Sequence, residues 1–178
     1  EQTRAFDGGL QIGVRVHPTL VPLDHPLASV RGSFNAVFVE GGASGDLMFY
    51  GRGAGGRPTA SAVLGDLIDA AGNLRRGHGA PIGALERARI APIDDVTSAF
   101  YLNVEVDDRP GVLAQVATVF GENGVSIRSM EQEGLGGEAR LVFITHAAKE
   151  RDLRSTLQGL RSLDAVRAVG SVLRVIGD

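Results

Sequence analysis

The sequence predicts an α+β protein in which a βαββαβ domain at the C-terminal end follows an incomplete α/β segment. Three observations support this prediction. Apolar and polar side chains alternate at residues 100–106, and apolar side chains recur at helical spacing at residues 112–120. Strand, strand, helix and strand patterns then follow in turn as far as residue 175. Before residue 98 the chain is instead rich in glycine, proline and short β-type runs.

Residues 100–106 form the first predicted strand of the C-terminal domain. Its buried face carries Phe100, Leu102, Val104 and Val106, and its other face carries Tyr101, Asn103 and Glu105. The run DDRPG interrupts this alternation. From Val112 to Phe120 the pattern is that of an amphipathic helix, and Asn123-Gly124 supplies its stop.

The remaining patterns complete the domain. They are a strand at Val125–Glu133, a turn at 134–137, a strand at Ala139–His146, a helix marked by Leu153, Leu157 and Leu160, and a strand at Val166–Val175. This order is the split βαβ, or ferredoxin-like, arrangement, in which both helices cover one face of an antiparallel sheet. Some other α+β domain built from the same elements is the alternative.

The composition excludes several classes of protein. With 178 residues, 43% hydrophobic and 22% charged, the chain can bury a core without metals or disulfides. It contains no cysteine, which excludes disulfides, thiol nucleophiles and thiolate metal sites. The net charge of −3 and the scattered arginines argue against a nucleic-acid partner. Because no membrane span and no signal peptide is recognisable, we expect a cytoplasmic protein without membrane contact.

The turn after the first strand carries the residues of a candidate binding site. Pro110 suits the first helical position, and Gly111 lets a ligand approach the backbone closely. The N–H groups of Gly111, Val112 and Leu113 would then form a positive helix end that suits a carboxylate, and Asp108 could receive an ammonium group. This pairing fits a free α-amino acid. The alternative is that an aspartate of this turn, Asp107 or Asp108, merely caps the helix.

The segment DRPGVLAQVATVFGENGVSIRSMEQ resembles the signature of ACT domains, and the resemblance extends over Ser98–Val175. In that family two copies pair edge to edge through the second strand, and effector amino acids bind at the seam. The resemblance therefore implies a homodimer and an effector site. Its residues here are Asp108, Gly111, Val112 and Leu113 from the turn, with Ser126 and Ile127 from the second strand. Many relatives have asparagine where this chain has Ser126. A ligand-free dimerisation module is the alternative.

A glycine-rich loop lies in the first part of the chain, after a predicted strand at Asp46–Tyr50. Gly51, Gly53 and Gly56 satisfy the G-x-G-x-x-G spacing of dinucleotide-binding loops, and a helix start follows. The second parallel strand of that fingerprint is missing, so a self-contained Rossmann domain is not expected. The loop could present its backbone to a cofactor held mainly elsewhere, or it could be a tight turn packed on a neighbouring sheet.

The runs VHPTLVP, HPLASVRGSFNAV and GAGGRPTASAV, in this order, resemble the end of the catalytic region of homoserine dehydrogenases. That family interconverts L-homoserine and L-aspartate 4-semialdehyde with NAD(P). The resemblance implies that the loop Gly53, Ala54 and Gly55 lies against the cofactor in a longer parent protein. Relatives usually have proline or alanine in place of Arg52. With the ACT resemblance, it implies a regulatory role with threonine as the feedback effector.

The family's catalytic lysine lies upstream of the matching stretch, and the single lysine here, Lys149, falls in the second predicted helix of the C-terminal domain. We therefore expect no catalytic residue in this chain, no cofactor bound to it alone, and no activity on its own. Its histidines lack the spacing of a metal site, so no metal ligand is expected. The predicted organisation is residues 1–72 from the catalytic region, a linker at 73–97 and an ACT domain at 98–178. The first residue, Glu1, is consistent with a chain cut from a longer one.

Overall fold

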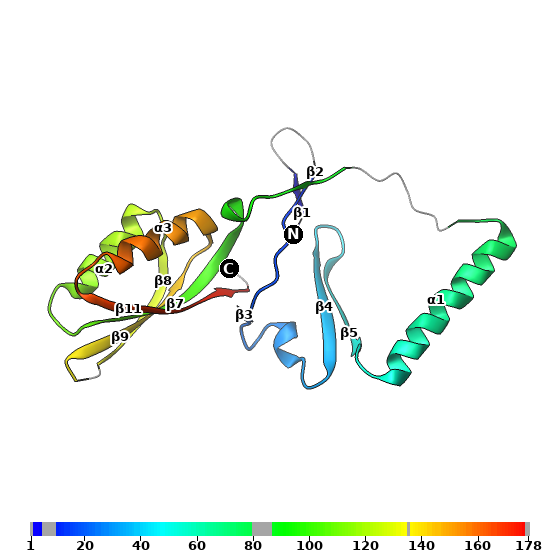
Figure 1. The fold of residues 1–178 in the computed structure, drawn as a ribbon, viewed down its shortest axis with the longest axis horizontal. Helices are drawn as coiled ribbons and strands as arrows, with labels where there is room; N and C mark the ends of the chain where they lie inside the picture. The colour runs from blue at the N-terminus through cyan, green and yellow to red at the C-terminus, as the bar shows by residue number, and fades with distance from the viewer. Residues whose placement is uncertain (1, 5–9, 80–86, 135, 177–178) are drawn as a thin grey trace. The chain divides into compact units, whose positions relative to one another are not determined.

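The computed structural model describes residues 2–4, 10–79, 87–134 and 136–176. The chain divides into two compact units. The first unit joins Glu1–Pro22 to Arg87–Asp178, and the second unit is Leu23–Glu86. Figure 1 shows the elements of each. Among the described helices, none combines the length and the apolar character that crossing a membrane would require.

The first unit contains the predicted ferredoxin-like domain. Its main sheet has the strand order β3-β11-β7-β9-β8, and β7, β8, β9 and β11 pair antiparallel. The strands are β3 (Thr19–Leu20), β7 (Thr97–Asp107), β8 (Ile127–Gly134), β9 (Glu138–Thr145) and β11 (Val166–Val175), with the short β10 (Ala148–Lys149) beside the start of β7. The α+β prediction is confirmed, and the last strand has the predicted bounds.

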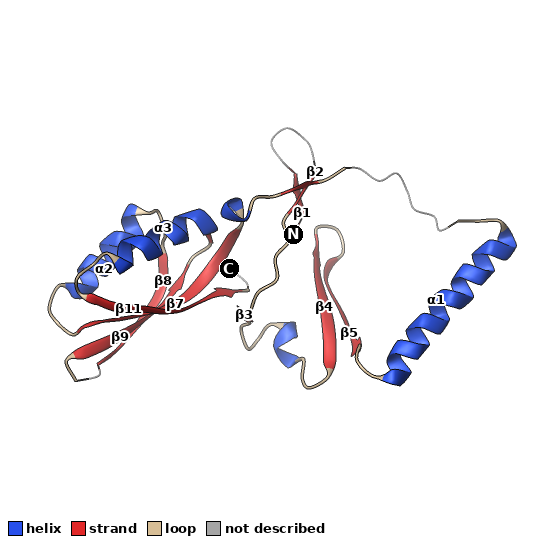
Figure 2. Cartoon of the chain, viewed as in Figure 1, coloured by secondary structure: helices blue, strands red, loops and turns tan. Residues whose placement is uncertain are grey.

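Two helices, α2 (Val112–Glu122) and α3 (Glu150–Arg161), cover one face of this sheet, as Figure 2 shows. Every second residue of β7 is buried beneath them, as the alternation at 100–106 predicted. The rings of Phe120 and Phe143 lie 5.0 Å apart between centroids in this core. The opposite face of β7, which includes Tyr101 and Asn103, is half-buried.

The first unit also includes chain from both sides of the second unit. A small sheet joins β1 (Gln2–Arg4), β2 (Leu10–Ile12) and β6 (Arg89–Ile90). The two-residue strand β3 adds a parallel strand to the end of β11. After β6, the 3-10 helix η2 (Ile93–Asp95) contacts α3 through ion pairs.

The second unit consists of a 3-10 helix η1 (Pro26–Ser29), a hairpin of β4 (Phe34–Gly41) and β5 (Gly45–Arg52), and the helix α1 (Gly56–Arg76). The hairpin pairs antiparallel over its whole length, and the rings of Phe34 and Tyr50 stack on it at 4.7 Å. None of the side chains of α1, all of them described, is buried. The glycine-rich loop connects β5 to α1.

Candidate functional site

The turn between β7 and α2 contains Asp108, Arg109, Pro110 and Gly111. Gly111 has φ +88° and occupies the N-cap of α2, which has no side-chain hydrogen bond. The prediction that Pro110 occupies the first helical position is therefore wrong, because the left-handed conformation of Gly111 separates it from the helix. The alternative in which an aspartate caps the helix is also wrong, since no carboxylate accepts a bond at this N-cap.

The backbone N–H groups of the turn differ in their availability. The N–H of Val112 donates to the carbonyl oxygen of Arg109 at 3.3 Å, so the prediction of a free amide is wrong for this residue. This bond closes the tight turn, and the sequence gives no sign of it. The N–H groups of Gly111 and Leu113 donate to no acceptor in the part of the chain that the structure describes. They remain available to an anion at the start of α2.

Asp108 is exposed, and its position is fixed by its backbone. Its N–H donates to the carbonyl oxygen of Gly137 at 3.2 Å. Its Oδ1 accepts a long hydrogen bond of 3.5 Å from the side-chain Nε2 of Gln132. Across the described residues, no arginine, lysine or histidine forms an ion pair with this carboxylate. An incoming ammonium group could therefore pair with it at little cost.

Asp107, the neighbouring residue, has a different role. It accepts hydrogen bonds of 2.8 Å from both Arg109 Nη2 and Arg167 Nε, and Arg167 also pairs with Glu138. The hydrogen bond from Arg167 lowers the pKa of Asp107 below its ordinary value. In return, the bond to Asp107 raises the pKa of Arg167. Asp107 thus links the end of β7 to the start of β11. Two arginines already neutralise its carboxylate, which disfavours a further cation from a ligand.

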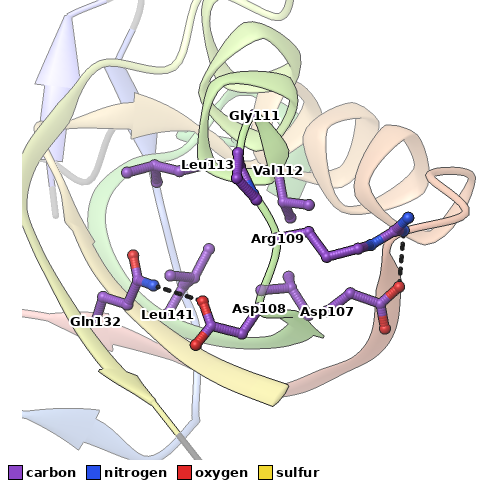
Figure 3. A pocket seen from close by; sticks show the side chains of 10 residues that line it. Asp107, Asp108, Arg109, Gly111, Val112, Leu113, Gln132 and Leu141 are labelled. Atoms are coloured by element: carbon purple, nitrogen blue, oxygen red, sulfur yellow. Dashed lines mark hydrogen bonds and ion pairs between the residues drawn. The ribbon is translucent and has the colours of Figure 1, made fainter. Parts of the chain in front are cut away.

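Gln132 is a site residue that sequence reasoning missed. It lies on β8 opposite Leu141 of β9, on the same face of the sheet as Met130. The sequence pattern that could have revealed Gln132 is its spacing of two residues from Met130. This spacing places Gln132 on the helix-covered face, near the end of the strand. Its amide is oriented toward the carboxylate of Asp108, as Figure 3 shows.

These groups surround one cavity of about 340 Å³. Asp108 and Gln132 supply its polar side, the start of α2 supplies Gly111 and Leu113, and Val106 and Leu141 contribute apolar surface. The full lining is Val106, Asp107, Asp108, Arg109, Pro110, Gly111, Val112, Leu113, Gln132 and Leu141. A small zwitterionic molecule suits this arrangement, because backbone N–H donors and the carboxylate of Asp108 line the same cavity.

Ser126 and Ile127 do not line this cavity. Ser126 is exposed just before β8, and its carbonyl oxygen accepts from the N–H of His146 at 2.8 Å. Ile127 begins β8 and is half-buried against the core. The expected role of both residues requires a second copy of the chain, so their assignment stays a prediction.

The predicted cofactor loop lies in the second unit. Gly53, Ala54 and Gly55 are exposed and consecutive between β5 and α1, and Gly55 has φ +121°. The hydroxyl and N–H of Thr59 both donate to the carbonyl oxygen of Gly55, at 2.8 and 3.1 Å. A Cβ on Gly53 would meet the side-chain amide nitrogen of Asn35, so a larger residue there would require that side chain to move. The loop is therefore a bare stretch of backbone that leads into a helix N-terminus.

Arg52, the departure from the usual sequence of the loop, is turned toward the hairpin. Its guanidinium lies 4.5 Å from the centroid of the Phe34 ring and donates to the hydroxyl of Ser33 at 3.2 Å. Within the described ranges, no group of three or more histidine, aspartate or glutamate side chains could hold a metal ion.

Two family models match this chain. The homoserine dehydrogenase model matches residues 3–68, and the ACT domain model matches residues 100–165. A homoserine dehydrogenase from Corynebacterium glutamicum is 49% identical over 173 residues, which are 97% of this chain and 39% of that protein. One from Mycobacterium tuberculosis is 45% identical over 184 residues, which are 99% of this chain and 42% of that protein.

Solved structures give the same match. The crystal structure of a homoserine dehydrogenase from Thiobacillus denitrificans has a TM-score of 0.85 at 32% identity, over 98% of this chain and 40% of that one. A Staphylococcus aureus homoserine dehydrogenase has a TM-score of 0.54 at 26% identity, over 90% of this chain and 37% of that one. The chain spans about two fifths of the length of the curated relatives it matches.

Proposed function

The chain belongs to the homoserine dehydrogenase family, as a C-terminal portion with an ACT domain, and on this premise we propose that its ACT domain senses a free amino acid. The proposed effector is threonine, acting by feedback on the parent enzyme. An effector regulates an enzyme when it binds one conformational state better than another, and the domain would supply that difference in affinity.

One observation carries this proposal: Asp108, whose carboxylate has no ion-pair partner among the described residues, lines one cavity together with Gly111 and Leu113, whose N–H groups find no acceptor there. The ammonium group of an α-amino acid would pair with Asp108, and its carboxylate would accept hydrogen bonds from the N–H groups of Gly111 and Leu113. Both contacts would be charge-assisted hydrogen bonds, which are about twice as strong as neutral ones. The start of α2 adds the favourable field of the helix dipole.

The side-chain end of the cavity supports threonine among the amino acids. Gln132 offers an amide that can bond a hydroxyl, and Val106 and Leu141 offer apolar surface for a methyl group. Threonine carries both groups on one carbon atom. A hydroxyl-binding amide rejects an isostere that lacks the hydroxyl, since the amide would lose its partner in the complex.

Isothermal titration of the chain with L-threonine tests the proposal. We expect saturable binding that Asp108→Asn weakens about tenfold or more, because a neutral amide cannot pair with the ammonium. Asp107→Asn is the matched control, since its carboxylate is already held by Arg109 and Arg167. Absence of heat at millimolar threonine, or equal losses in both variants, would contradict the assignment.

We further propose that two copies pair through β8, which has only β9 as a neighbour among the described strands. Ser126 and Ile127 of a second copy would then complete the effector site. The competing function is a ligand-free dimerisation module. Sedimentation tests the pairing, and thermal unfolding with and without threonine separates the two functions. A pure dimeriser keeps its melting temperature in both conditions, whereas a sensor gains stability on binding.

For the parent enzyme we propose the family reaction, NAD(P)-dependent interconversion of L-homoserine and L-aspartate 4-semialdehyde. Bound NAD(P) would supply the hydride chemistry of this reaction. The exposed backbone of Gly53, Ala54 and Gly55 would let a flat ring approach closely, and these residues would hold it. The chain alone is proposed to be inert, and turnover of NADPH with aspartate semialdehyde by the isolated chain would refute this.

A further inference from the structure

The first unit holds both connections to the second unit. The incoming connection, residues 10–22, joins the main sheet through β3, where Thr19 lies opposite Arg174 of β11. The N–H of Ile176 donates to the carbonyl oxygen of Leu20 at 3.0 Å. Upstream, Arg15 Nη1 donates to the hydroxyl of Ser98 at 2.8 Å. The incoming connection is thus attached to β11 and to the start of β7.

The outgoing connection, residues 87–97, is attached to α3. Asp94 pairs with Arg154 at 2.6 Å, and Asp95 pairs with Arg151 at 3.0 Å. These side chains are about half exposed, and such pairs contribute little individually. The attachment is strengthened by Val96, which is buried and whose carbonyl oxygen accepts from the N–H of Glu150 at 3.0 Å.

The first turn of α3 is linked to the incoming connection through β11. The carboxylate of Glu150 pairs with the guanidinium of Arg174, and the two side chains are only 12% and 22% exposed. Removing one partner of a pair with this little exposure is costly, because the other charge then stays buried without compensation. Arg174 lies opposite Thr19, so one helical turn is linked to both connections.

Gly159 of α3 lies directly against Val119 of α2. A Cβ at this position would lie 2.7 Å from Cγ1 of Val119 on α2. Because the backbone of α3 packs against Val119 with no side chain of its own at this point, we expect a shift of α2 to press on α3. Gly121, also on α2, has open space around its Cβ position and gives a control for any change of glycine to alanine.

We propose that α3 is the regulatory link of this chain: it carries a displacement of α2 to both connections of the second unit. The displacement starts at the N-terminal turn of α2, so the trigger rests on the proposed effector site. From α2 it passes through the Val119 and Gly159 contact. From α3 it reaches the outgoing connection through Arg151 and Arg154, and the incoming one through Glu150 and Arg174. Each step is a direct contact between packed groups, and coupling along it is measurable.

Hydrogen exchange of the effector-free chain tests the link without any ligand. Gly159→Ala should wedge α2 from α3 and raise amide exchange at residues 10–22 and 87–97 about tenfold, with a smaller change in β9. Gly121→Ala should leave both connections unchanged. The double variant Val119→Ala with Gly159→Ala, which relieves the clash, should restore slow exchange. Equal acceleration in β9 and in the connections would overturn the proposal.

A second arm uses L-threonine. In the unmodified chain threonine should slow exchange at residues 108–115 and also in both connections. Glu150→Gln should keep the first effect and lose protection of residues 10–22 selectively. Protection at 108–115 with no change in either connection would overturn the link and leave the effector site intact. No protection at 108–115 would count against the effector site, and the ligand-free variants would then decide the link.

Discussion

The two units use similar side chains in opposite ways. In the ACT domain, Leu102, Val104 and Phe143 are 0% exposed beneath two helices. In α1 of the second unit, Val63 and Leu67 are 53% and 61% exposed. Both regions show the apolar spacing that predicts regular structure. Apolar spacing therefore predicts a helix or strand. Whether its apolar face is buried depends on the elements that pack against it.

The hairpin of the second unit supports this interpretation. Its outward side chains Val37 and Phe49 are 61% and 65% exposed, although valine and phenylalanine are usually buried. Contiguous apolar surface of this kind marks a face that packs against something else. The chain spans about two fifths of its curated relatives, and we propose that the second unit is one piece of a larger catalytic domain.

The largest expected effect compares one truncation in each unit. Phe143→Ala should lower the free energy of unfolding by about 3–5 kcal/mol, because it leaves a cavity in the core. Leu67→Ala should change it by less than about 0.5 kcal/mol, because the side chain is mostly in solvent already. Urea unfolding followed by circular dichroism measures both. Similar losses in the two variants would break the comparison.

A smaller effect separates strain from binding. Gly111 and Gly77 have φ of +88° and +68°, and both adopt the left-handed conformation, which is unfavourable for alanine. Alanine at either position should cost about 1 kcal/mol of conformational strain. Only Gly111→Ala should also weaken threonine binding, about tenfold or more, because the N–H of residue 111 belongs to the proposed site and its position depends on this conformation. Titration of both variants measures this, and retained binding in Gly111→Ala would contradict the site.

The smallest effect concerns pH. The folded pKa of Asp107 is lowered by Arg167, so its contribution to stability is present above the ordinary pKa of 3.8 and is lost as pH falls through the folded value. The stability difference between the unmodified chain and Asp107→Asn should therefore shrink below about pH 4. Urea unfolding across acidic pH measures it, and a constant difference would show that Asp107 acts by packing alone.

Much of the ACT domain could be predicted from its sequence, because alternation and helical spacing are local. The bounds of β11 and the position of the turn at Gly111 are examples. The pairing of Thr19–Leu20 with β11 could not be predicted, because two residues are too few to show the alternation of a strand. The prediction of a free Val112 amide is wrong, because its acceptor is a backbone carbonyl in the turn that Gly111 closes.

The most direct test of the central claim is the amide NMR spectrum of the chain titrated with L-threonine. We expect large, saturable shifts of the Gly111 and Leu113 N–H resonances, because these groups lack an acceptor in the described structure. The Val112 resonance should move less, because its N–H already donates to Arg109. Unchanged Gly111 and Leu113 resonances at saturating threonine, or shifts confined to other parts of the chain, would contradict the account.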